Sequence, residues 1–164
     1  MSVDPPDDVW NTLTLEPFAV VFAKTIALEY ERRLLPWLSV AAGPSFTTGD
    51  TTTGGDAAVT GSYFAWGATL AARFYPWNEA PSGAFVSPFG GLAWASAEAG
   101  DDTSDGFGWS VGGLAGYTWI LGRYFVFSIG AGAAWLDMDV MTNGTSHGKR
   151  GVYPALRLAI GGAF

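Results

Sequence analysis

The chain contains no cysteine, few charged residues and no long apolar run, and each absence excludes something. Without cysteine there is no disulfide and no thiolate metal site. No apolar run approaches the roughly 18 residues of a transmembrane helix. The net charge of −7 argues against binding to nucleic acid, which requires a basic surface.

The composition of the chain is unusually apolar. Charged residues are 14% of the 164 residues, against about 25% in an ordinary soluble domain. Apolar residues are 49% of the chain and aromatic residues 15%, with 8 tryptophans and 23 glycines. A membrane β-barrel combines such a composition with the absence of a spanning helix, because its apolar residues alternate along strands.

The last thirteen residues, VYPALRLAIGGAF, show this alternation most clearly. Successive side chains of a strand point to opposite faces. One face of this segment therefore carries Val152, Leu156, Leu158, Ile160 and Phe164, and the other carries small residues and Arg157. The segment predicts a strand with one apolar face and one small or charged face, ending at an aromatic residue.

Similar patterns predict eight strands. We expect them at residues 11–22, 25–33, 37–47, 61–77, 84–97, 107–121, 123–137 and 152–164, with a bulge near Gly90 and Gly91. Short connections lie at 23–24, 35–36, 78–83 and Gly122, and long polar loops at 48–60, 98–106 and 138–151. Short turns, longer loops and an even strand number are typical of outer-membrane barrels. The sequence therefore predicts an all-β, eight-stranded antiparallel up-and-down transmembrane β-barrel at 11–164, after a flexible lead at 1–10.

The tryptophans fall into two groups along the predicted strands. The first group lies beside the short turns, and the second lies toward the long loops. The groups are Trp10, Trp37, Trp77 and Trp119, and Trp66, Trp94, Trp109 and Trp135. Two such groups at opposite strand ends predict two interfacial aromatic belts. The alternative is that these tryptophans pack the core of a soluble sandwich.

Charged residues occupy the face opposite the apolar one on several strands. They are Glu16, Glu29, Glu31, Arg33, Arg73 and Arg157. In a membrane barrel this face is the lumen, and an eight-stranded barrel is just wide enough for side chains to fill it. Charges there must be paired or hydrated. We expect Arg73 and Arg157 to neutralise the glutamates and close the lumen; the alternative is a narrow polar conduit.

Small residues on the same face leave room for water in this prediction. They are Gly67, Ala71, Gly112, Gly116, Gly130, Gly132 and Ala159. The loops are acidic and include Asp101, Asp102 and Asp105, which lack the ordered spacing of a calcium-binding loop. We therefore expect a solvated acidic rim and no metal site.

The chain resembles the small eight-stranded outer-membrane proteins typified by the protein X and protein A barrels. The resemblance extends from Asn11 over nearly the whole chain. The opening TLTLEPFAVVFAKTIALEYERRL, with its core Leu28–Glu29–Tyr30–Glu31, is also similar to the start of many uncharacterised bacterial outer-membrane barrels. These motifs specify architecture and no chemistry.

The resemblance implies a location and partners. It implies a monomer in a Gram-negative outer membrane, in contact with membrane lipid and lipopolysaccharide. Phe164 would end the strand that the outer-membrane assembly machinery recognises. The start of the chain lacks the basic and apolar regions of a signal peptide, so we expect an export signal to have been removed.

Catalysis is not expected. Lipid A deacylase barrels, which have the same overall form, place a histidine and a serine two residues apart on one face of a strand. Here Ser146 and His147 are adjacent and lie in the predicted last loop, so on a strand they would point in opposite directions. No nucleotide or phosphate motif is present, and no cofactor is predicted.

These expectations lead to a non-enzymatic barrel with a structural or surface-interaction role through acidic extracellular loops. A narrow water- or ion-conducting pore is the first alternative. The second is a soluble, lipocalin-like carrier of a small ligand. In the carrier, Phe125, Phe127 and Ile129 would point inward, and Arg73 and Arg157 would point outward.

Overall fold

A computed structural model describes residues 9–16, 25–53, 59–77, 79–99, 102–122, 124–142 and 145–164. The second part of the predicted first strand and the predicted short connection at 23–24 lie outside these residues. The part of the chain that the structure describes has no helix long and apolar enough to cross a membrane.

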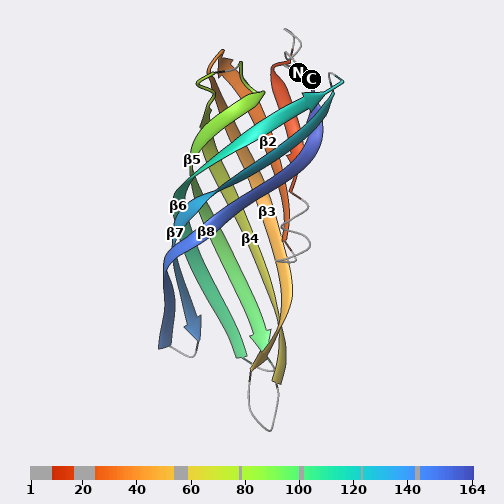
Figure 1. Cartoon of the computed structure of the whole chain (residues 1–164). Helices are drawn as coiled ribbons and strands as arrows, with labels where there is room; N and C mark the ends of the chain where they lie inside the picture. Colours follow the sequence, from red (N-terminus) through yellow and green to blue (C-terminus); the bar gives the residue numbers. More distant parts are fainter. Residues whose placement is uncertain are drawn as a thin grey trace.

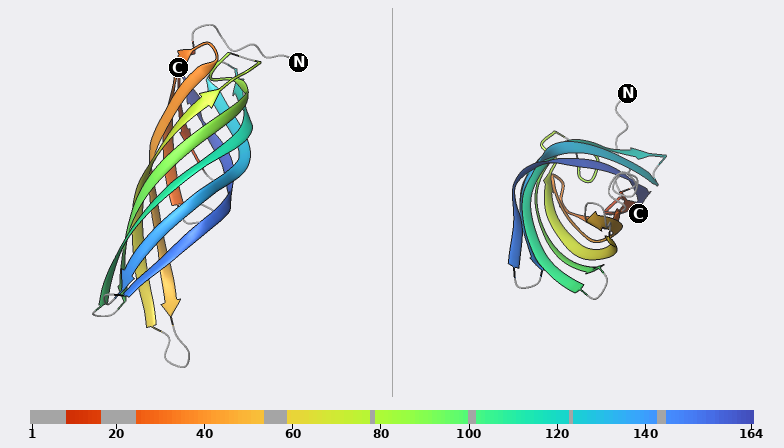
Figure 2. Two further views of the ribbon diagram at one scale, coloured as in Figure 1. Left: turned by 90° about the vertical axis from the view of Figure 1, so that its left-hand side faces the viewer. Right: turned by 90° about the horizontal axis from the view of Figure 1, so that it is seen from below.

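The fold is a closed barrel of eight strands, each antiparallel to the next, with β8 returning to pair with β1 (Figures 1 and 2). The strands are β1 (Asn11–Leu15), β2 (Thr25–Leu35), β3 (Leu38–Thr53), β4 (Val59–Phe74), β5 (Gly83–Ala99), β6 (Asp102–Leu121), β7 (Phe125–Thr142) and β8 (Thr145–Ala163). The predicted all-β, antiparallel, up-and-down barrel of eight strands is confirmed.

The strands run much further than predicted at the end away from the termini. β3 continues to Thr53, which lies opposite Val59 of β4, and β7 continues to Thr142, opposite Thr145 of β8. The prediction of three long loops is therefore wrong. The segments are polar and rich in threonine, glycine and aspartate, a composition that suggested loops. Threonine is β-branched and suits a strand, so these residues pair across hairpins instead.

The bulge expected near Gly90 and Gly91 is absent from β5. Its register with β6 is continuous from Gly83 opposite Thr118 to Ala99 opposite Asp102. The pattern looked irregular because Phe85 and Phe89 face inward on an otherwise small lumen face. They lie directly opposite Gly116 and Gly112. A register shift does occur in the described pairs, between Arg33 and Leu35 of β2.

Inward glycines let neighbouring strands approach closely. A Cβ on Gly43 would lie 1.8 Å from the carbonyl oxygen of Leu28, and one on Gly132 would lie 2.0 Å from that of Gly113. Since these contacts are with backbone, no side chain could move aside to make room. Glycine at these positions permits the tight curvature of a small barrel.

Both chain ends lie at the end of the barrel that carries the β2–β3, β4–β5 and β6–β7 turns, which we call the turn end (Figure 1). Gly122 in the β6–β7 turn has φ +59°, a left-handed conformation that favours glycine. The backbone nitrogens of Trp10 and Asn11 donate to the carbonyl oxygen of Phe164. Val9 is buried with Ile120, Val126 and Ala163, so the packed barrel includes residues before the predicted boundary at residue 11.

Candidate functional site in the barrel lumen

The barrel has an apolar outer face and a polar inner face. Phe125 is 49% exposed and Ile129 is 40% exposed, whereas Arg73 and Arg157 are 2% and 7% exposed. Phe127 shares the outward face with its neighbours Phe125 and Ile129, since strand side chains alternate. These orientations are opposite to those that the lipocalin-like alternative requires.

The outer face carries an apolar band between two charged ends. Among the strand side chains that the structure describes, the outward charges are Arg32 near the turn end and Asp105, Asp137, Asp139 and Arg150 at the other end. On β7 the band runs from Phe125 to Trp135. Ten residues rising about 3.4 Å each, on a strand tilted by about 40°, give a band about 25 Å tall.

The first predicted tryptophan group lies at the turn end. Trp10, Trp37 and Trp77 are exposed, and Trp37 stacks on Phe74 with ring centroids 6.0 Å apart. Trp119 is half-buried between Tyr117 and Phe127, with centroid distances of 4.5 and 5.6 Å.

The second tryptophan group was predicted at the strand ends toward the long loops. It does not lie there, because the strands continue past it. Trp66 and Trp94 lie opposite each other and stack with centroids 4.4 Å apart. Phe107 follows in the same row, 5.4 Å from Trp94. Trp109 and Trp135 are exposed on β6 and β7. This row borders the apolar band, and polar strand segments extend beyond it.

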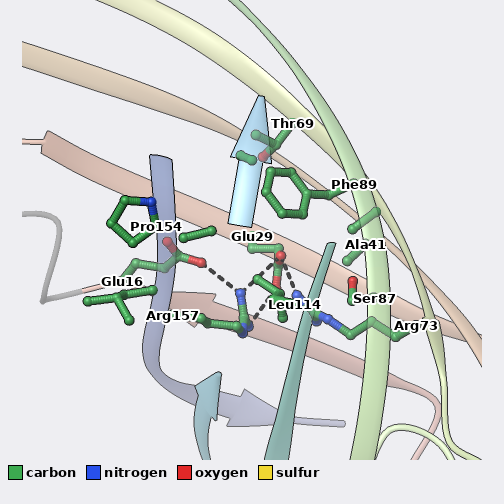
Figure 3. A pocket seen from close by; sticks show the side chains of 14 residues that line it. Glu16, Glu29, Ala41, Thr69, Arg73, Ser87, Phe89, Leu114, Pro154 and Arg157 are labelled. Carbon is green, nitrogen blue, oxygen red and sulfur yellow. Dashed lines mark hydrogen bonds and ion pairs between the residues drawn. The ribbon is translucent and has the colours of Figure 1, made fainter. Parts of the chain in front are cut away.

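Inside the barrel, Arg157 of β8 joins two glutamates. Its Nη1 lies 2.7 Å from Glu16 Oε1, and its Nη2 lies 2.8 Å from Glu29 Oε1. Its Nε donates to the hydroxyl of Ser128 at 3.3 Å. Arg157 therefore links β8 to β2 and to Glu16, the residue that follows β1 (Figure 3).

Arg73 of β4 continues this chain of ion pairs on the other side of Glu29. Its Nη2 lies 2.6 Å from Glu29 Oε2, and its Nη1 bonds to Glu31 Oε2. Glu31 also accepts from the hydroxyl of Ser39 and, at 2.8 Å, from that of Tyr75. The full chain, which we call the crossbar, runs Glu16–Arg157–Glu29–Arg73–Glu31.

Arg33, the sixth residue of the predicted network, is not part of the crossbar. Its Nη2 lies 3.3 Å from Glu79 Oε2, in the β4–β5 turn. Its guanidinium carbon lies 5.5 Å from the centre of the Trp10 ring. The register shift beside Arg33 falls at this point, where β2 leaves the lumen for the turn.

Two groups of buried side chains fill the lumen between the crossbar and the turn end. One is the cluster of Val9, Ile120, Val126 and Ala163. The other contains Tyr75, Ala80 and Phe85, with rings of Tyr75 and Phe85 5.8 Å apart. Ala159 is fully buried, and Phe85 covers Gly116. At this level the small inward residues do not leave the room for water that was predicted.

The crossbar forms one side of a cavity on the side away from the turn end. This cavity has a volume of about 360 Å³. Glu16, Glu29, Arg73 and Arg157 line it together with Phe89, Leu114 and several small residues (Figure 3). Thr69 faces the lumen yet is exposed, which shows that side chains do not fill the lumen at its level.

The chemistry of the site favours binding and structural roles. The buried groups are paired carboxylates and guanidiniums, and the described residues contain no group of three or more histidine or acidic side chains placed to hold a metal ion. Ser146 and His147 lie on β8, opposite Met141 and Val140, and not in a loop as predicted.

Sequence reasoning missed several residues that complete the lumen. Tyr75 and Ser39 bind Glu31, and Phe85 and Phe89 cover glycines. Tyr75 could have been found, because it continues the inward alternation of Arg73 past the end of β4. Ser39 could not, since a serine on a lumen face carries no signal of a specific partner.

Neither a scan against models of known protein families nor a search of curated proteins finds a match for this chain. The barrel and its lumen therefore carry the functional argument alone.

Proposed function

We propose that the protein is a non-enzymatic transmembrane β-barrel of a Gram-negative outer membrane, monomeric, with a lumen that does not conduct. One observation carries this proposal: large apolar side chains cover the outside while the ion-paired charges are buried inside. A soluble protein has the opposite arrangement, whereas a lipid-facing barrel needs an apolar exterior about 25 Å tall.

The crossbar and the packed turn end support a closed lumen. The crossbar connects opposite walls of the barrel, from Arg157 on β8 through Glu29 to Arg73 on β4. Beyond it, Tyr75, Phe85 and Val126 are at most 2% exposed. Ions crossing the lumen would have to displace both layers.

The role of such a barrel would be structural or would lie in surface interaction. Asp105, Asp137 and Asp139 gather at the end away from the turns, and Arg150 pairs with Asp137 at 2.6 Å. Outer-membrane lipid and lipopolysaccharide are the proposed partners there. At the other end, Phe164 would serve the assembly machinery.

An arginine placed on the apolar band tests the membrane assignment. Ala131→Arg puts a charge in the middle of the outward face of β7. It should destabilise a barrel in lipid by about 2–4 kcal/mol, measured by urea unfolding in lipid vesicles. Thr48→Arg, outward on β3 beyond the aromatic row, is the matched control and should have little effect.

Equal stabilities of these two variants would contradict the membrane assignment, as would a monodisperse monomer without detergent. Planar-bilayer recording tests the closed lumen. No discrete openings are expected. Openings that are abolished by blocking the lumen would instead favour the narrow pore.

A further inference from the structure

The lumen cavity has the size and the wall of a small-molecule site. Its volume of about 360 Å³ falls within the roughly 300–1,000 Å³ typical of ligand pockets. It is lined by residues of β3 to β8, by Glu29 of β2 and by Glu16. Most of these residues face the lumen, whereas Pro154 and Leu156 belong to the exposed face of β8. The crossbar and the packed turn end close it on one side.

The charges beside the cavity favour a cation. The crossbar contains three carboxylates and two guanidiniums, so it is one positive charge short of neutrality. Both guanidiniums are engaged by carboxylates and at most 7% exposed. An anion entering the cavity would therefore meet an excess of negative charge.

Glu16 is the carboxylate that remains most available. Glu29 Oε2 accepts from both arginines and its Oε1 accepts from Arg157. Glu31 accepts from Arg73, Ser39 and Tyr75. Among the described partners, Glu16 has a single ion pair, from Oε1 to Arg157. Its side chain is 25% exposed, against 12% for Glu29 and 3% for Glu31.

The rest of the wall is mostly apolar. Phe89 lies over Gly112, and a Cβ on Gly112 would be 2.8 Å from Cζ of the Phe89 ring. The other apolar residues of the wall are Leu114, Ala41, Ala71, Ala134, Pro154, Ala155 and Leu156. A cavity lined by both an aromatic ring and a carboxylate suits an ammonium group attached to an apolar body, because the ring also attracts cations.

We propose that the cavity binds a small organic cation, an ammonium group on a compact apolar body. Its ammonium lies on Glu16 and its body packs against Phe89 and Leu114. This site goes beyond the structural role proposed above. It depends on the lumen geometry alone, so its failure would leave the membrane assignment intact.

Three probes of similar size and the same phenyl body test the charge preference: 2-phenylethylamine, 2-phenylethanol and phenylacetate. Dissociation constants are measured by NMR titration of methyl-labelled protein in lipid nanodiscs, following Leu114 and Ala134. The amine should bind at least tenfold more tightly than the alcohol or the acid. Glu16→Gln should abolish that preference. Binding of phenylacetate as tight as that of the amine, or an unchanged preference in Glu16→Gln, would overturn the proposal.

A matched pair of variants separates the lumen from lipid partitioning. Ala134→Leu adds volume inside the cavity, whereas Ala133→Leu adds the same volume to the outward face of β7. The first should weaken amine binding at least tenfold, and the second should leave it unchanged. Equal affinity of the two variants for the amine would contradict the proposed site. If Ala134→Leu does not fold, Ala155→Leu fills the same cavity from β8.

Discussion

The two halves of the lumen are built on opposite principles. In the turn-end half, Tyr75, Phe85 and Val126 are nearly inaccessible, and the crossbar ties five charged groups together. In the half away from the turn end, which we call the distal half, glycine and alanine dominate the inward face. A cavity of about 360 Å³ remains there. One barrel therefore contains a packed core and an unfilled chamber along the same axis.

The crossbar also joins the first strand to the last, where the barrel closes. β1 pairs with β8 from Thr12 opposite Ala163 to Leu15 opposite Ile160. Arg157 of β8 reaches Glu16, the residue that follows β1, at 2.7 Å. Side-chain ion pairs thus act beside the backbone hydrogen bonds that close the barrel.

The largest expected effect comes from breaking the crossbar with Arg157→Leu. Glu16 and Glu29 would lose a guanidinium that both of them contact. Removing one partner of a buried ion pair costs about 3–5 kcal/mol. The measurement is the free energy of unfolding in urea, followed by tryptophan fluorescence in lipid vesicles.

Arg150→Leu is the control for this change, on the same strand with the same substitution. Arg150 pairs with Asp137, but its side chain is 66% exposed. Solvent screens such a pair, so the loss should be much smaller. If both variants were equally stable, the crossbar would contribute nothing specific and the contrast between the two halves would fail.

An intermediate effect is expected from adding the same volume to each half. Ala159 is fully buried in the turn-end half, and Ala134 lines the cavity. Ala159→Leu should overpack its surroundings and cost about 1–3 kcal/mol. Ala134→Leu should be nearly neutral in the same unfolding experiment. The reverse order would show that the distal half is the packed one.

The smallest effect is expected from Tyr75→Phe. This change removes the hydroxyl that donates to Glu31 Oε1 at 2.8 Å and keeps the buried ring. Glu31 keeps Arg73 and Ser39 as partners, so no buried charge is left without a hydrogen bond. The expected loss is therefore that of one typical hydrogen bond, about 0.5–1 kcal/mol. Tyr117→Phe changes an outward tyrosine and is the control. A loss as large as that of Arg157→Leu would mean that the ring packing also changed.

Much of the architecture could be predicted because alternation is a local property. The inward placement of Arg73 and Arg157 follows from their phase relative to Phe74 and Leu156. The lengths of the strands could not be predicted in the same way. Thr51 to Thr53 are polar, and only their pairing with residues 59–61 of β4 makes them a strand.

The sequence predicted the charged residues of the candidate site, but not the polar and aromatic residues that surround them. Arg33 follows the same alternation as Glu29 and Glu31, yet it pairs with Glu79 because β2 changes register and reaches the turn there. Phe89 carried no phase signal beside Gly90 and Gly91. Its role depends on Gly112, which lies opposite it on β6 and leaves room for its ring.

The sequence by itself determined the strand period, the number of strands and the two faces, because side chains alternate along a strand whatever it pairs with. Only the tertiary structure decided which charges meet, where the strands end and which half of the lumen is filled. Those outcomes depend on register, since pairing brings residues such as Glu16 and Arg157 within 2.7 Å although 141 positions separate them in the chain.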